Sequence, residues 1–238
     1  MPEILDPKCA LCPTRICENN GVKMDEGPPS MEKLPGFCPM KIMPDVFTDA
    51  AVEYKKPEIG EFARLASVQE FQCFEHPTQH HRAKLSRVEE LIQFAAKCDY
   101  KKLGIAHCGG LIKEAGMLTR ILENSGFEVV SVQCKAGATP KEDIGIQASE
   151  KISGPEYWES MCNPIAQAMI INRTGVDLAI MLGLCIGHDT LFIKYCSAPV
   201  TVLAVKDRLL AHNPLGALYL SESYYRYLRK EPGDISRK

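Results

Sequence analysis

Groups that can do chemistry gather in one stretch of the chain, from 162 to 208, at the ends of apolar segments. Cys162 precedes an apolar helical run, and Cys185 follows an apolar strand-like run and lies three residues before His188. A cysteine next to a histidine suits nucleophilic or acid–base work, and Asp189 follows closely enough to share the same pocket. We therefore treat these four residues as candidate catalytic groups.

Two further cysteines follow apolar segments in the same way: Cys108 after 102–107 and Cys134 after 127–133. A thiol at the start of a helix meets unpaired N–H groups and the positive end of the helix dipole, which favour the thiolate. A buried lone cysteine is usually inert, but four of them at one edge are difficult to ascribe to packing alone. We call this set the rim thiols: Cys108, Cys134, Cys162 and Cys185.

Groups that suit an anion accompany these thiols. Gly109 and Gly110 permit a tight turn whose N–H groups could cradle a negative charge, although two glycines are not a nucleotide-binding fingerprint. Lys206 and Arg208 follow the last apolar strand-like run and could hold a carboxylate or a phosphate, with a solvated turn as the alternative. The expected ligand of the rim is a small anion.

A separate set of cysteines opens the chain: Cys9, Cys12, Cys17 and Cys38, in the pattern C-x2-C-x4-C-x20-C. The first spacing lets two thiolates reach one metal from a tight turn, and two more complete a tetrahedron. The segment around them is rich in glycine and proline and has few apolar residues, so a metal would supply the missing cross-link. We expect zinc at all four cysteines, with an iron–sulfur cluster as the alternative because two of them precede proline.

The elements that must position these groups follow from hydrophobic periodicity. We expect a metal-binding segment over 1–45, a helical segment over 46–98 and an α/β domain over 99–238. In the last part, strands over 102–107, 127–133, 178–184 and 200–205 alternate with helices over 114–124, 165–172, 190–195 and 215–228. In the helical segment we expect helices over 46–54 and from Pro57, and a third that begins at a capping box at Ser86.

This alternation predicts an α/β fold with a parallel, doubly wound sheet, Rossmann-like or flavodoxin-like, of about four or five strands. Such folds bind ligands outside the carboxyl ends of the strands. The rim thiols are expected at that edge.

Composition excludes several classes. The net charge of −2 and the lack of a basic run argue against nucleic acid as a partner. The most apolar run is too short to span a bilayer and the start of the chain does not resemble a signal peptide, so we expect a soluble, cytoplasmic protein with no membrane partner. An odd number of cysteines, 11, argues against a disulfide framework. A homo-oligomer is compatible with the sequence.

Several motifs resemble those of a known family: the N-terminal C-x2-C-x4-C, IAHCGG, VVSVQCK, MCNPIAQA, GLCIGHDTLFIKY and APVTVLAVKDRLLAHNPLGALY. They are similar to an uncharacterised prokaryotic family of cysteine-rich proteins, a domain of unknown function described as metal-binding. The resemblance covers nearly the whole chain and implies metal binding at the N-terminal cysteines. A fainter likeness, in Cys162-Asn163 and the segment 183–188, is to cofactor-independent amino-acid racemases that use two cysteines.

Three hypotheses follow. The first is a metal-binding protein whose rim does redox chemistry or handles metal or sulfur. The second is a cysteine-dependent enzyme, racemase-like or acyl-transferring, that acts on a small anionic substrate. The third is a binding module in which the metal segment presents a partner surface. The sequence favours the first and leaves open whether the protein is an enzyme.

Overall fold

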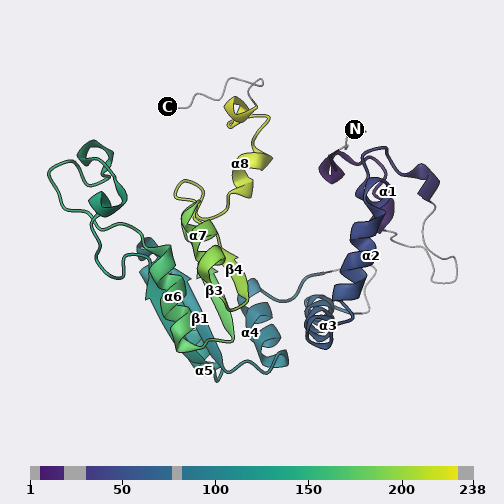
Figure 1. Cartoon of the computed structure of the whole chain (residues 1–238), viewed down its shortest axis with the longest axis horizontal. Coiled ribbons are helices and arrows are strands. Elements are labelled where there is room, and N and C mark those ends of the chain that lie inside the picture. Colours follow the sequence, from purple (N-terminus) through teal and green to yellow (C-terminus); the bar gives the residue numbers. More distant parts are fainter. Residues whose placement is uncertain (1–5, 19–30, 77–81, 230–238) are drawn as a thin grey trace. The chain divides into compact units, whose positions relative to one another are not determined.

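A computed structural model describes residues 6–18, 31–76 and 82–229 of the chain (Figure 1). The chain divides into two compact units, 1–68 and 69–238, which we describe separately. The boundary falls inside the segment 46–98 that the sequence predicts to be helical. No helix in the described ranges is long and apolar enough to cross a membrane.

The first unit consists of short helices. Three 3-10 turns, η1 (Cys9–Leu11), η2 (Ile16–Glu18) and η4 (Met31–Lys33), are followed by α1 (Pro39–Ile42), α2 (Pro44–Glu53) and α3 (Pro57–Gln72), which runs on into the second unit. Each of the three α-helices begins at a proline, whose fixed φ and missing N–H suit the first helical position. The two helices predicted in this region are confirmed as α2 and α3, and α1 is an additional single turn.

The second unit is built on a four-stranded sheet, and the predicted parallel α/β fold is confirmed. The strands β1 (Lys102–His107), β2 (Glu128–Gln133), β3 (Leu178–Leu182) and β4 (Val200–Ala204) lie in the order β2-β1-β3-β4, and every pair is parallel. The predicted strands start or end at most two residues away from these bounds. Because all four strands run in one direction, their carboxyl ends meet at one edge.

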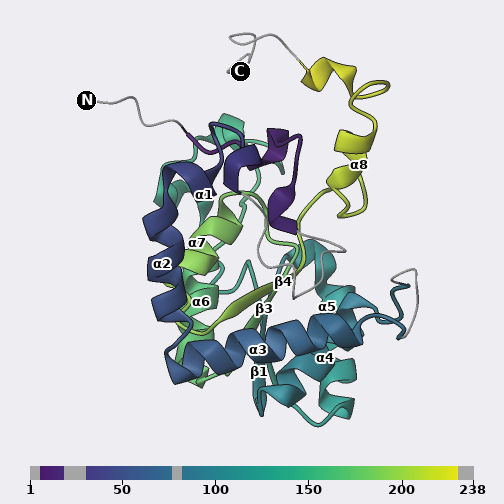
Figure 2. The ribbon, with the colours of Figure 1, turned by 90° about the vertical axis from the view of Figure 1, so that its right-hand side faces the viewer.

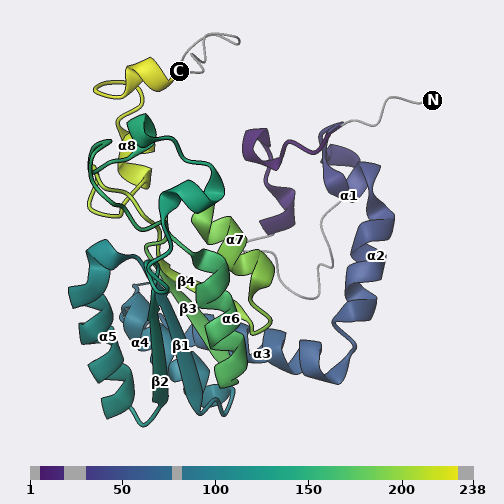
Figure 3. The same ribbon diagram turned by 60° about the vertical axis from the view of Figure 1, so that its left-hand side comes forward.

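Helices cover both faces of this sheet: α4 (Arg87–Lys97), α5 (Ile112–Asn124), α6 (Pro164–Thr174) and α7 (His188–Tyr195). Side chains of a strand alternate between the faces. Leu103 and Ile105 of β1 therefore pack with α4 and α5, whereas Ala106 packs with α6 and α7. Figures 2 and 3 show the strands between these two helical layers.

Close packing on the second face depends on a glycine within β1. A Cβ added at Gly104 would lie 3.2 Å from a methyl carbon of Val176 and 3.3 Å from one of Ile171. Both neighbours are buried, so α6 can approach β1 this closely only because the strand has no side chain there. This contact fixes the position of α6, which begins two residues after Cys162.

The predicted capping box at Ser86 is confirmed. The Ser86 hydroxyl accepts a hydrogen bond from the Glu89 N–H at 3.4 Å, and the Glu89 carboxylate accepts one from the Ser86 N–H at 2.7 Å. These bonds satisfy N–H groups that have no partner within the helix, and α4 begins at the following residue.

The helix predicted over 215–228 is wrong over most of its length. The chain forms only α8 (Leu215–Tyr219) and the 3-10 turn η8 (Arg226–Leu228), joined by turns. Ser223 lies in the middle of this segment and donates from both its N–H and its hydroxyl to the Leu220 carbonyl. Serine competes with the helix through such local hydrogen bonds, which explains the interruption.

Candidate functional site

The four rim thiols lie at the carboxyl edge of the sheet. Cys108 follows β1, Cys134 follows β2, Cys185 comes after β3, and Cys162 lies two residues before α6. Cys108 and Cys185 are close enough to Cys162 for their negative charge to raise its pKa. The structure therefore brings together the rim thiols, which the sequence places far apart along the chain.

Two of these thiols, Cys134 and Cys162, affect each other's acidity. Cys134 is only 3% exposed, and its sulfur accepts a hydrogen bond from the Gly109 N–H at 3.3 Å. The backbone next to it is also paired, because the Asn163 N–H donates to the Cys134 carbonyl at 2.7 Å. The side chains of Cys134 and Cys162 interact so that the pKa of Cys134 is raised, which favours its thiol, and the pKa of Cys162 is lowered, which favours its thiolate.

This interaction separates the acidities of the pair. The hydrogen bond to Cys162, reinforced by burial, raises the pKa of Cys134 well above its ordinary value. The same bond lowers the pKa of Cys162 from 9.0 to about 7; burial opposes this shift, and the charge of Lys135 supports it. Cys162 is half-buried and is the more reactive thiol of the two.

The start of α6 holds Cys162 in place. Asn163 is the N-cap, and its side-chain oxygen accepts a hydrogen bond from the Ala166 N–H at 3.0 Å. One turn later, the fully buried Gln167 donates from its amide nitrogen to the carbonyls of Val132 at 2.7 Å and His107 at 3.2 Å. The helix is thus tied to both β1 and β2 directly below the thiol pair.

Gln167 also carries an unmet hydrogen-bonding group. Its side-chain oxygen is buried and is the single buried side-chain nitrogen or oxygen without a hydrogen-bond partner among the residues that the structure describes. Such a group usually costs free energy unless it has a structural or functional use. Its amide nitrogen nevertheless ties α6 to β1 and β2 next to the segments that carry Cys108 and Cys134.

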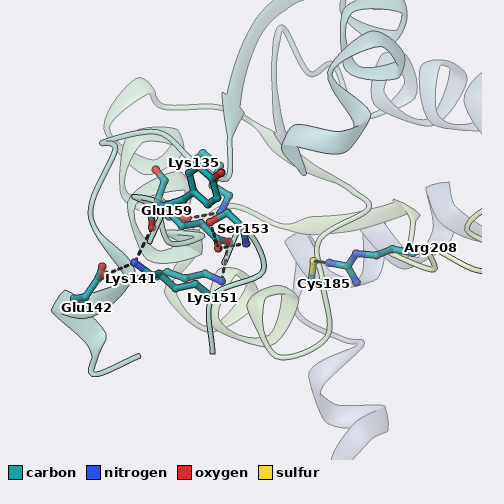
Figure 4. A network of polar contacts seen from close by, with 10 residues as sticks. Lys135, Lys141, Glu142, Lys151, Ser153, Glu159, Cys185 and Arg208 are labelled. Atoms are coloured by element: carbon teal, nitrogen blue, oxygen red, sulfur yellow. Dashed lines mark hydrogen bonds and ion pairs between the residues drawn. The ribbon is translucent and has the colours of Figure 1, made fainter. Parts of the chain in front are cut away.

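Cationic groups approach the other two thiols. The Arg208 guanidinium donates a hydrogen bond from Nη2 to the Cys185 sulfur at 2.9 Å (Figure 4). A Cβ added at Gly110 would lie 3.2 Å from Nζ of Lys206 and 3.9 Å from the Cys108 sulfur. Lys206 therefore reaches over the glycine turn next to Cys108.

His188 and Asp189 form the first turn of α7. Burial lowers the pKa of half-buried His188, and the Asp189 carboxylate opposes this shift. The Asp189 side chain accepts a hydrogen bond from the Thr190 N–H at 2.7 Å. The N–H groups of His188 and Asp189 both donate to the Cys185 carbonyl at 3.0 Å, so the predicted Cys–His proximity is present in the backbone.

An ordered loop separates the paired thiols along the chain. Between β2 and α6, Lys141 and Glu159 form an ion pair at 2.8 Å with both side chains largely buried, and Lys151 bonds Glu142 at 2.9 Å (Figure 4). Lys135 donates to the Ser160 carbonyl near the base of the loop. These contacts fix the loop that begins after Cys134 and ends before Cys162.

The N-terminal cysteines lie in the first unit, all as free thiols. Cys9 and Cys17 are exposed, and Cys12 and Cys38 are half-buried. The Cys12 N–H donates to the Cys9 carbonyl at 3.0 Å, which closes the tight turn expected of C-x2-C. A hydrogen bond with Thr14 lowers the pKa of Cys12.

The donor set suits a soft metal, since four thiols occur in one short unit. Within the described ranges, however, no three or more cysteine, histidine, aspartate or glutamate side chains come together closely enough to hold a metal ion. This applies to the N-terminal cysteines and to the rim thiols alike. The metal site therefore stays a prediction.

Two residues of the site were not singled out from the sequence. Lys135 could have been found, because it directly follows Cys134 at a strand end and its charge acts on Cys162. Gln167 gave no signal, since a glutamine on an apolar helix looks like a surface residue until its position is known. Its burial is visible only in the fold.

Comparison with known proteins agrees with the resemblance in the motifs. The family model described as "Protein of unknown function (DUF1847)" matches residues 38–203, a range that includes all four rim thiols. An uncharacterized protein, MJ0455, of Methanocaldococcus jannaschii is 44% identical over 175 residues, which cover 74% of this chain and 84% of the relative. The chain belongs to this DUF1847 family of proteins of unknown function.

Proposed function

We propose that the rim is a thiol-based redox site, in which Cys162 attacks a sulfur–sulfur bond and Cys134 completes the exchange. One feature supports this most directly: Cys134 and Cys162 shift each other's pKa in opposite directions, and the Asn163 N–H bond to the Cys134 carbonyl at 2.7 Å holds their backbones together. In such a pair the attacking cysteine is ionised near neutral pH, and the second cysteine stays protonated until it resolves the mixed disulfide.

The exchange consists of two steps. The Cys162 thiolate attacks one sulfur of a substrate disulfide, a mixed disulfide forms, and the other half of the substrate leaves as a thiolate. The Cys134 thiol then loses its proton and attacks the Cys162 sulfur, which releases the second half of the substrate. Two electrons pass from the protein to the substrate. The proton that Cys134 loses leaves one product as a thiol, and the other product is a thiolate because Cys162 reacts as a thiolate.

The environment of Cys134 suits the second step. Once Cys162 is in a mixed disulfide it no longer accepts a hydrogen bond as a thiolate, so the main cause of the raised pKa of Cys134 is removed. The Gly109 N–H remains 3.3 Å from the Cys134 sulfur and favours its thiolate. Burial keeps Cys134 away from external reagents until Cys162 has reacted.

A chemical trapping experiment tests this function. Reduced protein is treated with bis(hydroxyethyl) disulfide, and its disulfides are mapped by peptide mass spectrometry. We expect an internal Cys134–Cys162 disulfide in the unmodified chain and a stable mixed disulfide at Cys162 in Cys134→Ser. The matched control is Cys196→Ser, which changes a half-buried thiol at the C-terminal end of α7, away from Cys185. This variant should behave like the unmodified chain.

A different pattern would overturn the proposal. Disulfides that map to other pairs, or no reaction at Cys162 while the protein remains folded, contradict a redox role for this pair. Selective alkylation of Cys162 without disulfide formation would instead favour the cysteine-dependent enzyme.

For the first unit we propose a metal, zinc or an iron–sulfur cluster, at Cys9, Cys12, Cys17 and Cys38. The free state of all four thiols and the closed turn between the first two support it. Metal analysis and an absorption spectrum of anaerobically purified protein test it, with the paired change Cys9→Ser and Cys12→Ser as the comparison. We expect one metal site that this change abolishes; metal content that does not respond would refute the assignment.

A further inference from the structure

The surroundings of the thiols carry positive charge that the described part of the chain does not neutralise. Three side chains contribute it: Lys135 next to Cys162, Lys206 next to Cys108 and Arg208 on Cys185. In residues 6–18, 31–76 and 82–229, none of these three cations takes part in an ion pair.

The carboxylates nearby are occupied by the backbone. Asp207 accepts hydrogen bonds from the N–H groups of Leu209 at 2.9 Å and Leu210 at 2.8 Å. Asp189 accepts one from the Thr190 N–H at 2.7 Å. Further out, Lys141 is paired with Glu159, so that pair adds no net charge. These bonds leave the charges of Asp189 and Asp207 in place, but the three cations Lys135, Lys206 and Arg208 exceed these two carboxylates by one.

The placement of these cations is specific. They come from the ends of two strands: Lys135 follows β2, and Lys206 and Arg208 both follow β4. Lys206 lies next to the turn after β1, and Arg208 contacts Cys185 after β3. Solvated surface lysines would have no such relation to sulfur atoms. Each cation thus lies beside a rim thiol: Lys135 acts on Cys162, Lys206 lies by the turn of Cys108, and Arg208 contacts Cys185.

From this arrangement we infer that the compound reduced at the rim is a small anionic disulfide, whose carboxylate or other acidic group is held by Lys206 and Arg208 while its sulfur meets Cys162. The inference rests on the proposed redox function. It adds the substrate class: a low-molecular-weight anion is favoured over neutral and cationic disulfides. Lys135 keeps the Cys162 thiolate charged and also attracts the substrate.

Three disulfides of similar size and different charge test the substrate class: dithiodipropionate, bis(hydroxyethyl) disulfide and cystamine. The rate of reaction at Cys162 is measured for each at low and high salt. Since one unit charge about 6 Å away in water changes a rate about threefold, we expect the anion to react at least about tenfold faster than the cation at low salt. The difference should shrink at high salt because mobile ions screen exposed charges.

Variants identify the groups responsible. Lys206→Met combined with Arg208→Gln should lower the anion-to-cation ratio about tenfold. Arg173→Gln removes one positive charge from an exposed residue in the last turn of α6, at the opposite end from Cys162, and should leave the ratio unchanged. A ratio near one in the unmodified chain, or a ratio that the double change does not lower, overturns the inference.

A second pair of reagents separates this inference from the redox function. Iodoacetate and iodoacetamide alkylate a thiolate in the same way, but only the first is an anion. If no disulfide reacts at Cys162, the redox function fails, and the ratio of these two alkylation rates still measures the preference for an anion. A lowered ratio in the double variant supports the anion site; an unchanged ratio refutes it.

Discussion

The acidity of Cys162 offers the sharpest test of the site, because one hydrogen bond is its main cause. Replacing Cys134 by alanine removes the hydrogen bond that lowers the pKa of Cys162 to about 7. Burial, which raises the pKa of Cys162, would then be opposed only by the charge of Lys135. We expect the pKa of Cys162 to return towards 9.0.

The effect on reactivity has two opposing parts. At pH 7 a thiol with a pKa of about 7 is about 50% thiolate, whereas one with a pKa of about 9 is about 1% thiolate, a difference of about 50-fold. The more acidic thiolate is intrinsically less nucleophilic, by about 6- to 10-fold for two pKa units. The net expectation is that Cys162 in the unmodified chain reacts about 5- to 8-fold faster at pH 7 than in Cys134→Ala.

The assay follows alkylation of Cys162 by iodoacetamide between pH 5 and 10, with the modified peptide quantified by mass spectrometry. The rate should rise around pH 7 in the unmodified chain and nearer pH 9 in Cys134→Ala. Cys134→Ser retains a hydroxyl that can donate to Cys162 and should keep most of the shift. A midpoint near pH 9 in the unmodified chain, or the same midpoint in the alanine variant, would refute the reasoning.

Four further substitutions test the surroundings of the site. Gly175→Ala, at a φ of +62° with open space around the added Cβ, should lower the free energy of unfolding by about 1 kcal/mol in urea titrations. Gly183→Ala, at a φ of +68°, places its Cβ 2.2 Å from a carbon of the buried Leu111 and should lower this free energy by about 3 kcal/mol. Equal losses in the two variants would contradict a clash at Gly183. Gln167→Leu removes the amide that donates to the carbonyls of His107 and Val132, and it should lower the free energy of unfolding by about 1–3 kcal/mol in the same titrations. A stabilised variant would show that removing the unpaired amide oxygen gains more than the lost hydrogen bonds cost. Hydrogen bonds from Lys141, and less strongly from the Ser153 N–H, lower the pKa of Glu159 to about 2. The Glu159 carboxylate therefore contributes its full stabilisation of the loop above pH 4.5, and this contribution is lost as the pH falls towards 2. Lys141→Met should therefore speed hydrogen exchange in 141–159 at pH 7, and unchanged exchange would show that the ion pair does not hold the loop.

The position of the rim thiols was predictable because it depends on only two regularities. Apolar runs that alternate with helical patterns predict parallel strands, and parallel strands end at one edge. Cys108, Cys134 and Cys185 each come directly or shortly after such a run, so their convergence required no knowledge of side-chain contacts. Cys162 lies at the same edge because the start of the helix that follows a strand lies near that strand's carboxyl end.

The pairing among the thiols was not predictable in the same way. Nothing in the spacing of the four cysteines says that Cys134 bonds Cys162 rather than Cys108, because this depends on how the loop between β2 and α6 closes. That closure depends on contacts that no periodic pattern encodes, such as the buried ion pair of Lys141 with Glu159. The prediction of a helix over 215–228 failed for a related reason. The hydrogen bonds that Ser223 donates to the Leu220 carbonyl prevail over a helical pattern of apolar residues.

The closure of the loop between β2 and α6 also sets the position of the thiol pair. A long loop would ordinarily leave its two ends free to move apart, and bringing two sulfurs together would then cost conformational entropy. Here the ends are already joined, by the Asn163 N–H on the Cys134 carbonyl at 2.7 Å and by the antiparallel bridge between Pro140 and Ser160. The entropy is lost during folding rather than during the reaction, so the two sulfurs meet at a high effective concentration. The reversible dithiol that we propose would require such an arrangement of its two ends.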